Sequence, residues 1–169
     1  MSEPRTAWVR HVVARGKPIL FDLEGFHHDP ALLPALQPDA MTLDAMLATQ
    51  CLVLLGEPGL GKSDTLLQAY ERIRSSASED GYLYLDGRDL FDPEADLFKT
   101  LQFTRWRDDG RPLHLFIDSL DEGPSGFTPK LLSKLRGDLP RENMYLRIAC
   151  RTGELPEQLD RELPQLWPQ

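Results

Sequence analysis

The chain of 169 residues lacks the features of a membrane, secreted or nucleic-acid-binding protein. No apolar run approaches the roughly 18 residues that a membrane-spanning helix needs, and residues 1–16 have no signal-peptide core. The formal net charge is −8, and Lys and Arg form no block. This argues against a dedicated nucleic-acid surface, because neutralising phosphates needs clustered cations. A cytoplasmic location is the default expectation.

Cysteine is also scarce, since the chain has only Cys51 and Cys150. Both lie in segments that we expect to be strands of one parallel sheet, near opposite ends. Four residues of strand rise would separate them by about 13 Å, whereas a disulfide needs Cα atoms within about 7 Å. We therefore expect two free, buried thiols.

The apolar and charged fractions, 41% and 27%, are ordinary for a soluble globular domain, and the length suits one domain. From residue 51 onward, short apolar runs alternate with segments of helical periodicity. We expect strands at 51–55, 82–86, 113–117 and 144–150, and helices at 62–75, 92–109 and 128–139. This alternation predicts an α/β protein with right-handed crossovers and a parallel sheet covered on both faces.

Residues 1–50 are harder to interpret. Residues 9–13 fit either a short helix or a strand, and residues 41–47 predict a short helix that Thr42 or Asp39 could cap.

The stretch around which the chain is organised follows the first expected strand and matches G-x-x-x-x-G-K-[ST], the Walker A phosphate-binding loop. Its residues are Gly56, Glu57, Pro58, Gly59, Leu60, Gly61, Lys62 and Ser63. The glycines allow backbone N–H groups to face a triphosphate. We expect the Lys62 ammonium to reach the β- and γ-phosphates and the Ser63 hydroxyl to ligate Mg²⁺. Asp64 completes the expected nucleotide-binding segment. The alternative is a glycine-rich turn without a ligand.

A second candidate site follows the third expected strand. Asp118 stands at the carboxyl end of that strand, where an acid that organises Mg²⁺ belongs. Asp121 or Glu122 could then orient or deprotonate the attacking water. The alternative is a solvated acidic turn. His114, inside the same strand, is better interpreted as a core or strand-edge histidine than as a catalytic residue, because catalytic groups sit at the carboxyl ends of strands.

Residues 115–122, LFIDSLDE, look like the acidic motif of STAND nucleotidases of the NACHT type. In that motif an apolar strand ends in Asp, and a small residue, an apolar residue and Asp-Glu follow. Cys150 and Arg151 resemble the family's sensor-1 position, where an arginine points toward the γ-phosphate. A cation there could detect the third phosphate. In the alternative, Arg151 is a surface residue that pairs with Glu154.

The resemblance covers about residues 50–152 and implies a P-loop NTPase three-layer sandwich with a 51432-like sheet whose fifth strand is missing here. It places the first strand beside the fourth, and the third between the fourth and the second. It also places adenine against the segment upstream of the loop, in residues 20–48. The expected organisation is an N-terminal segment (1–50), a nucleotidase core (51–152) and a tail (153–169) that is poorly ordered or leans on a partner.

The function that the resemblance implies is an ATP-binding, Mg²⁺-dependent nucleotidase core of a signalling switch, in signalling or defence such as bacterial immunity against phage. ATP and ADP would favour different domain arrangements, with downstream domains of the same chain and self-association as the expected partners. Two alternatives remain: an AAA+-like or other ordinary P-loop ATPase, and a module that binds nucleotide without turnover. No guanine-reading Asn-Lys-x-Asp motif occurs, which favours ATP over GTP.

Overall fold

The computed structural model describes residues 11–17, 40–42, 45, 47–76, 80–137 and 139–168. The chain divides into two compact units, Met1–Ala48 and Thr49–Gln169. Each unit is described by itself. None of the described helices is both long and apolar enough to cross a membrane.

In the first unit, two short strands form an antiparallel pair. Strand β1 (His11–Val13) pairs with β2 (Ala40–Thr42), with Val12 opposite Met41. The prediction of a helix at 41–47 is therefore wrong for its first two residues, because Met41 and Thr42 belong to β2. The Thr42 hydroxyl does accept a hydrogen bond from the Ala45 amide at 3.3 Å, as an N-cap residue would. Most of the segment expected to face adenine lies outside the described residues.

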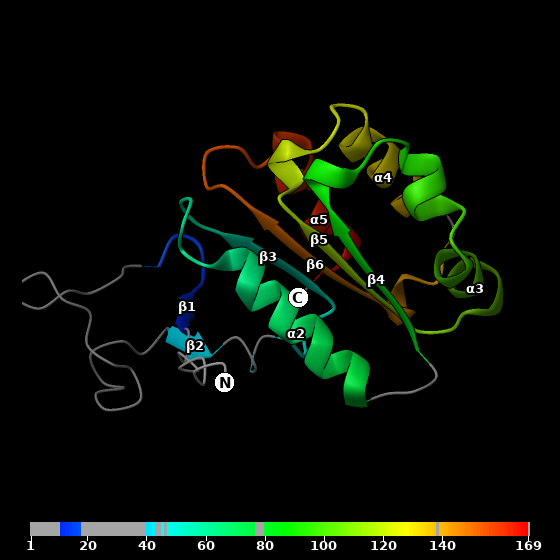
Figure 1. The fold of residues 1–169 in the computed structure, drawn as a ribbon, viewed down its shortest axis with the longest axis horizontal. Coiled ribbons are helices and arrows are strands. Elements are labelled where there is room, and N and C mark those ends of the chain that lie inside the picture. Colours follow the sequence, from blue (N-terminus) through cyan, green and yellow to red (C-terminus); the bar gives the residue numbers. More distant parts are fainter. Residues whose placement is uncertain are drawn as a thin grey trace, which may run out of the picture. The chain divides into compact units, whose positions relative to one another are not determined.

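The second unit is built on a parallel sheet of four strands, β3 (Cys51–Leu55), β4 (Gly81–Asp86), β5 (Leu113–Asp118) and β6 (Met144–Cys150). Its strand order is β3-β6-β5-β4 (Figure 1). The first strand thus lies beside the fourth, and the third lies between the fourth and the second, which is the order that the resemblance implied. The carboxyl ends of the strands meet at one edge, where Leu55 pairs with Cys150 and Asp86 with Asp118.

The two cysteines are free, as predicted. Cys51 begins β3 opposite Leu146, whereas Cys150 ends β6. Cys150 is buried but Cys51 only partly so. Burial raises the pKa of each thiol to about 12, so neither is a reactive thiolate near neutral pH.

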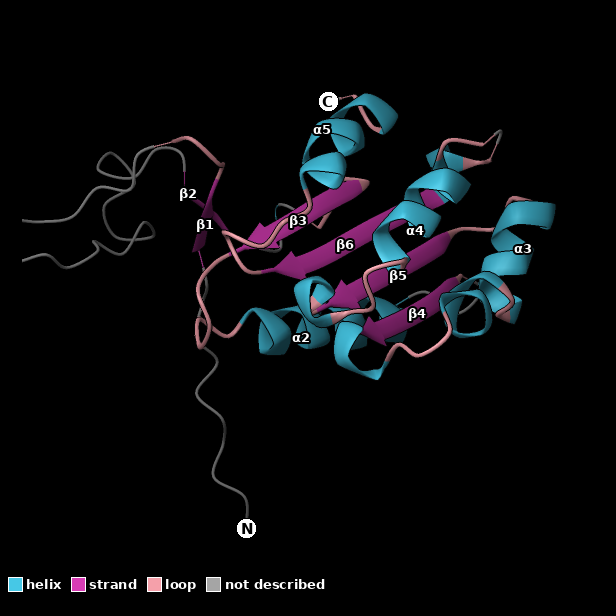
Figure 2. Ribbon diagram, turned by 90° about the horizontal axis from the view of Figure 1, so that it is seen from above, coloured by secondary structure: helices cyan, strands magenta, loops and turns pink. Residues whose placement is uncertain are grey.

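Four α-helices pack on this sheet: α2 (Lys62–Ser76), α3 (Leu101–Asp109), α4 (Phe127–Leu135) and α5 (Glu157–Leu166). Figure 2 shows α2 on one face of the sheet and the other three helices toward the opposite face. The helices therefore complete three layers, as expected for a parallel α/β sheet.

The helix expected at 92–109 is interrupted. A short π-helical segment, η2 (Glu94–Phe98), comes first, and α3 begins only after Thr100. The Thr100 hydroxyl accepts a hydrogen bond from the Phe103 amide at 3.3 Å, so this threonine caps a new helix. Gly110 ends α3 with a left-handed φ of 66°, a conformation that favours glycine.

The expectation of a poorly ordered or partner-dependent tail is wrong. Residues 157–166 form α5, and its apolar residues Leu159 and Leu163, together with Trp167, are buried in the core. The helix is joined to α4 by an ion pair between Arg136 and Glu162 at 2.6 Å. Leucines four residues apart supply the apolar stripe that holds α5 on the sheet.

The two faces of the sheet differ in composition. Side chains alternate between faces along a strand, and one set is almost wholly aliphatic and packs under α3, α4 and α5 in one hydrophobic cluster. We call this the aliphatic face. The other set lies under α2 and contains rings and charges; we call it the α2 face. Its members are Leu52, Leu54, Tyr82, Tyr84, Asp86, His114, Phe116, Asp118, Tyr145, Arg147 and Ala149.

Candidate functional site

The phosphate loop connects β3 to α2 and has the backbone that its glycines predict. Gly59 and Gly61 have φ values of 82° and 73°, in the left-handed region that side chains disfavour. A Cβ atom on Gly56 would lie 3.2 Å from Leu60 Cδ1 and 3.6 Å from Lys62 Cδ. A side chain at position 56 would therefore crowd the side chains of Leu60 and Lys62, which would have to shift.

Lys62, the first residue of α2, lies over the start of the loop. Its Nζ donates hydrogen bonds to the carbonyl oxygens of Gly56 at 2.6 Å and Glu57 at 3.0 Å. The ammonium group is thus held inside the curve of the loop. An ammonium there is a compact point charge of the kind that contacts phosphate oxygens.

The first turn of α2 carries the remaining predicted loop residues. Ser63 is exposed, so its hydroxyl is accessible, and Asp64 accepts a hydrogen bond from Gln68 at 3.0 Å. The Thr65 hydroxyl donates to the Gly61 carbonyl at 2.8 Å and fixes the junction between loop and helix. The helix thus presents its amino-terminal end, with its partial positive charge, to the space beside the loop.

Asp118 is the last residue of β5 and is only 3% exposed. Each carboxylate oxygen accepts one hydrogen bond: Oδ2 from the Tyr84 hydroxyl at 3.1 Å and Oδ1 from the Ser119 amide at 2.9 Å. A carboxylate oxygen has two acceptor directions, so both retain one for another partner. Burial together with the nearby carboxylate raises the pKa of Tyr84 above its usual value.

The loops that follow β4 and β5 pack against each other beside Asp118. A Cβ atom on Gly87 would lie 2.1 Å from the Ser119 carbonyl oxygen and 3.1 Å from the Gly123 nitrogen. Ser119 itself has a left-handed φ of 49°. Only glycine at position 87 permits this approach, which holds the acidic loop in place.

The three residues predicted to be catalytic lie together. Arg151, directly after β6, donates through Nη2 to Glu122 at 2.6 Å, and its Nε lies 3.2 Å from an Asp121 oxygen. The Arg151 amide also donates to Asp121 at 3.1 Å. Arg151 therefore pairs with the acidic loop and not with the side chain of Glu154, which was the alternative for a surface arginine.

The two acids differ in exposure. The Asp121 side chain is 5% exposed and is bound by both the backbone and the side chain of Arg151, whereas the Glu122 side chain is 37% exposed. Asp121 thus ties the β5 loop to the end of β6, while Glu122 has access to solvent and to a ligand at this edge. The sequence left both acids open as the base, and this difference in exposure favours Glu122.

The two side chains predicted to ligate Mg²⁺, Ser63 and Asp118, offer oxygen atoms, which are the ligands that this ion prefers. No group of three or more His, Cys, Asp or Glu side chains that could hold a metal occurs among the described residues. Mg²⁺ is commonly held by one or two protein oxygens plus water and substrate phosphates, so a protein cage is not required. Asp118 and Ser63 are the oxygen donors that would hold it here.

Two partners at this edge were missed by the sequence analysis. Tyr84 fixes the Asp118 carboxylate, and Arg88 forms a two-pronged ion pair with Asp86, with Nε 2.9 Å from Oδ1. This pair lowers the pKa of Asp86 below its usual value. No motif marks Tyr84 or Asp86 in the sequence; the only available signal is the alternation of side chains along a strand, which puts the two on one face.

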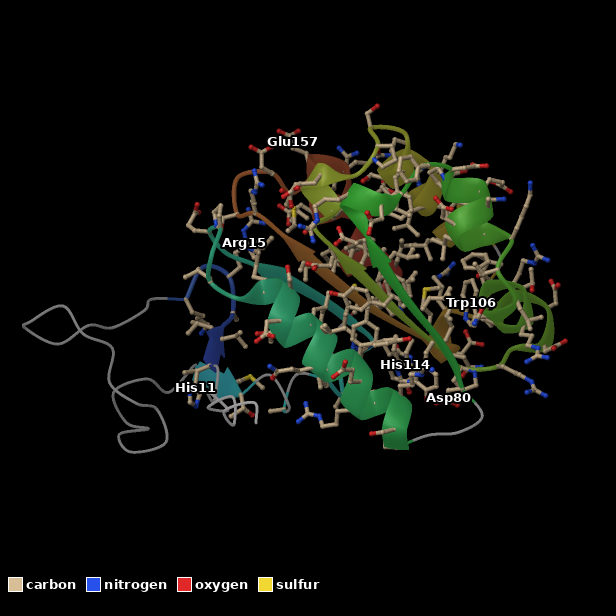
Figure 3. All side chains as sticks on the ribbon, viewed as in Figure 1. His11, Arg15, Asp80, Trp106, His114 and Glu157 are labelled. Carbon is tan, nitrogen blue, oxygen red and sulfur yellow. The ribbon has the colours of Figure 1, made fainter. Side chains whose placement is uncertain are left out.

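His114 is buried on the α2 face, as predicted for a core histidine. Its Nε2 lies 3.2 Å from Asp80, and its ring stacks between Tyr82 and Tyr145 with centroid distances of 5.2 and 4.6 Å. Figure 3 shows His114 and Asp80 at the end of the sheet where β4 begins, away from the phosphate loop. Neither residue belongs to the candidate site.

Comparison with known proteins adds no family to these observations. No protein-family model matches the sequence, and no curated protein matches it significantly.

Proposed function

We propose that this chain is the ATP-binding, Mg²⁺-dependent nucleotidase core of a STAND/NACHT-like signalling switch with the P-loop NTPase fold. The observation that carries the proposal is the meeting of three elements at one edge of a parallel sheet. The phosphate loop follows β3, Asp118 ends β5, and Arg151 follows β6, which lies between them. Ligands of open α/β sheets bind outside the carboxyl ends of the strands, where these groups stand.

The loop would bind the triphosphate through backbone N–H groups and Lys62. Lys62 already lies over the loop, held by two carbonyl oxygens. A phosphate oxygen makes a stronger, charge-assisted hydrogen bond to the ammonium than a neutral carbonyl does. Replacement of the two carbonyl oxygens by phosphate oxygens around Lys62 therefore favours nucleotide binding.

Mg²⁺, when bound, supplies positive charge that neutralises the phosphates. The residues that would hold it are Ser63 and Asp118. Tyr84 and the Ser119 amide keep the Asp118 carboxylate in one orientation. This arrangement requires little rearrangement when the ion binds.

Glu122 is the proposed base, and Arg151 is the proposed sensor of the γ-phosphate. The direct bond between them, 2.6 Å, means that a phosphate would compete with Glu122 for the same guanidinium. Transfer of Arg151 to the phosphate would release the Glu122 carboxylate to accept a proton from water. ATP, but not ADP, would make this exchange, which provides the difference in affinity that a switch needs.

The resemblance of residues 115–122 supports the STAND assignment over an ordinary ATPase, and bacterial antiviral defence is the role that it implies. The proposed ligands are ATP and ADP, in the cytoplasm. The main competing function is a module that binds nucleotide without turnover. We propose that hydrolysis by this chain alone is slow, because Arg151 holds the Glu122 carboxylate in an ion pair.

The rate of ATP hydrolysis by the variants Glu122→Gln and Asp121→Asn distinguishes a nucleotidase from a module that binds nucleotide without turnover. We expect Glu122→Gln to bind ATP normally and to hydrolyse it at least about 100-fold more slowly, as loss of a general base does. Asp121→Asn should lose stability as well as activity, because Asp121 joins two strand ends. Unchanged hydrolysis in both variants would contradict the assignment of the base. Release of phosphate is the measurement, and Glu154→Gln is the control.

A further inference from the structure

A cavity lies at the opposite end of the sheet from the phosphate loop, beside the edge strand β4. Its volume is about 300 Å³, which is at the lower limit for small-molecule sites. Its walls come from the last turns of α2, the start of β4, the first turns of α3 and the loop before β5. Gly81 belongs to this wall, with its amide bonded to the Pro112 carbonyl at 2.8 Å.

Three arginines from three different elements line this cavity: Arg74 of α2, Arg105 of α3 and Arg111 of the loop before β5. Among the described lining residues the only carboxylate is Asp80, so these residues carry a net charge of +2 in a chain of net charge −8. No carboxylate among the described residues forms an ion pair with these arginines. Like charges gathered around one cavity repel each other unless an anion neutralises them.

The one acid of the lining already has partners. Asp80 bonds to His114 at 3.2 Å, near the start of β4 (Figure 3). Burial, together with the Asp80 carboxylate, raises the pKa of Tyr82. Asp80 is thus engaged by groups of the α2 face and forms no ion pair with the three arginines.

Two aromatic rings line the cavity beside the arginines. The Arg74 guanidinium lies 5.9 Å from the centroid of the Tyr70 ring, within the range of a cation–π contact. Tyr82 adds a second ring, which is backed by the stack with His114. The three arginines are exposed, so their N–H donors are accessible to an anion from solvent.

We propose that this cavity, lined by Arg74, Arg105 and Arg111 with Tyr70 and Tyr82, is a binding site for a small polyanion that carries phosphate or carboxylate groups. The site is separate from the phosphate loop, and the inference does not depend on nucleotide binding there.

Titration of the full chain with pyrophosphate and, separately, with citrate, followed by two-dimensional ¹H–¹⁵N NMR, tests the proposal. The protein carries Lys62→Ala, so that binding at the phosphate loop is weakened. We expect saturable shifts of the amides of Gly81, Tyr82 and Gln102, with a dissociation constant of about 1 mM or tighter. The anion that produces them identifies the ligand as a phosphate or a carboxylate.

The matched variants are Arg74→Gln combined with Arg105→Gln, and Arg107→Gln as the control. Arg107 lies on α3 like Arg105, but it pairs with Asp108 and does not line the cavity. The double variant should weaken binding at least about tenfold, since it removes two of the three positive charges that line the cavity, and Arg107→Gln should not. The proposal is wrong if neither anion shifts these amides at about 10 mM, or if the double variant and the control bind equally.

Discussion

The two faces of the sheet differ in the side chains that they bury: one is aliphatic, and the other carries polar and charged groups. Under α3, α4 and α5 the strands present side chains such as Leu115, Leu146 and Ile148, and the core there is nearly without polar groups. Under the single helix α2, the same strands present His114, Asp118 and Arg147. Because α2 begins at the phosphate loop and ends at the basic cavity, both candidate sites are connected to the polar face.

Arg147 illustrates the difference best. It is fully buried in the middle of β6, packs against the rings of Phe116 and Tyr145, and donates to the Thr49 carbonyl at 3.1 Å. Burial lowers the pKa of this arginine to about 10. Residues of this kind contribute less to stability than their size suggests, because removing a charge from water has a cost.

Substitutions at two adjacent positions of β6 should show the largest difference between the two faces in the loss of stability. Leu146→Ala, on the aliphatic face, should lower the free energy of unfolding by about 2–5 kcal/mol, because it leaves a cavity. Arg147→Met keeps volume on the α2 face and removes a buried charge together with its hydrogen bond to the Thr49 carbonyl, so it should cost about 1.5 kcal/mol or less. Urea unfolding measures both. Equal losses would mean that the α2 face depends on the charge as strongly as the other face depends on packing.

A smaller effect is expected where the loops after β4 and β5 meet. Gly87→Ala would push its Cβ against the Ser119 carbonyl, so we expect a loss of about 1–3 kcal/mol together with slower ATP hydrolysis. Gly126→Ala is the control, because a Cβ there meets nothing within 4 Å and its φ is −82°. Thermal unfolding and phosphate release are the measurements. A harmless Gly87→Ala would show that the acidic loop is not held by this contact.

The smallest effect concerns pH. Burial is the main cause that lowers the pKa of His114, and the Asp80 bond opposes it only in part. The unfolded chain then binds a proton more readily than the folded chain, so stability falls as pH drops through about 6.5, the value for an unfolded histidine. His114→Phe keeps the ring stack and should lose less stability than wild type between pH about 7.5 and about 5.5. Identical pH dependence of the two proteins would contradict this account.

The strands followed from the sequence because buried parallel strands give short apolar runs at regular spacing. Their order came only from the family resemblance, since apolar spacing carries no information on which strands are neighbours. The phosphate loop and Asp118 could be predicted from the sequence because each belongs to a motif whose residue types have a physical explanation. The pairing of Arg151 with Glu122 did not, since contacts between loops from different strands depend on tertiary packing. The NTPase function itself stays a proposal.

Two errors have local causes. The break before α3 was missed because the apolar spacing of residues 97–106 continues through it, although Thr100 is a good cap residue. Helix α5 was missed because three prolines dominated the interpretation of the tail. Pro156 precedes the helix and Pro164 lies in its last turns. The leucines at 159, 163 and 166 had helical spacing and should have outweighed them.

The central claim is that the phosphate loop binds ATP with Mg²⁺, and calorimetric titration of the wild type and Lys62→Ala tests it most directly. Exposed Lys130→Ala is the control for loss of a positive charge. We predict saturable binding to wild type and to the control, and a loss of about 10- to 100-fold in affinity for Lys62→Ala, as expected for one charged hydrogen bond. Equal affinity of Lys62→Ala and wild type, or no binding to the wild type at all, would contradict the account.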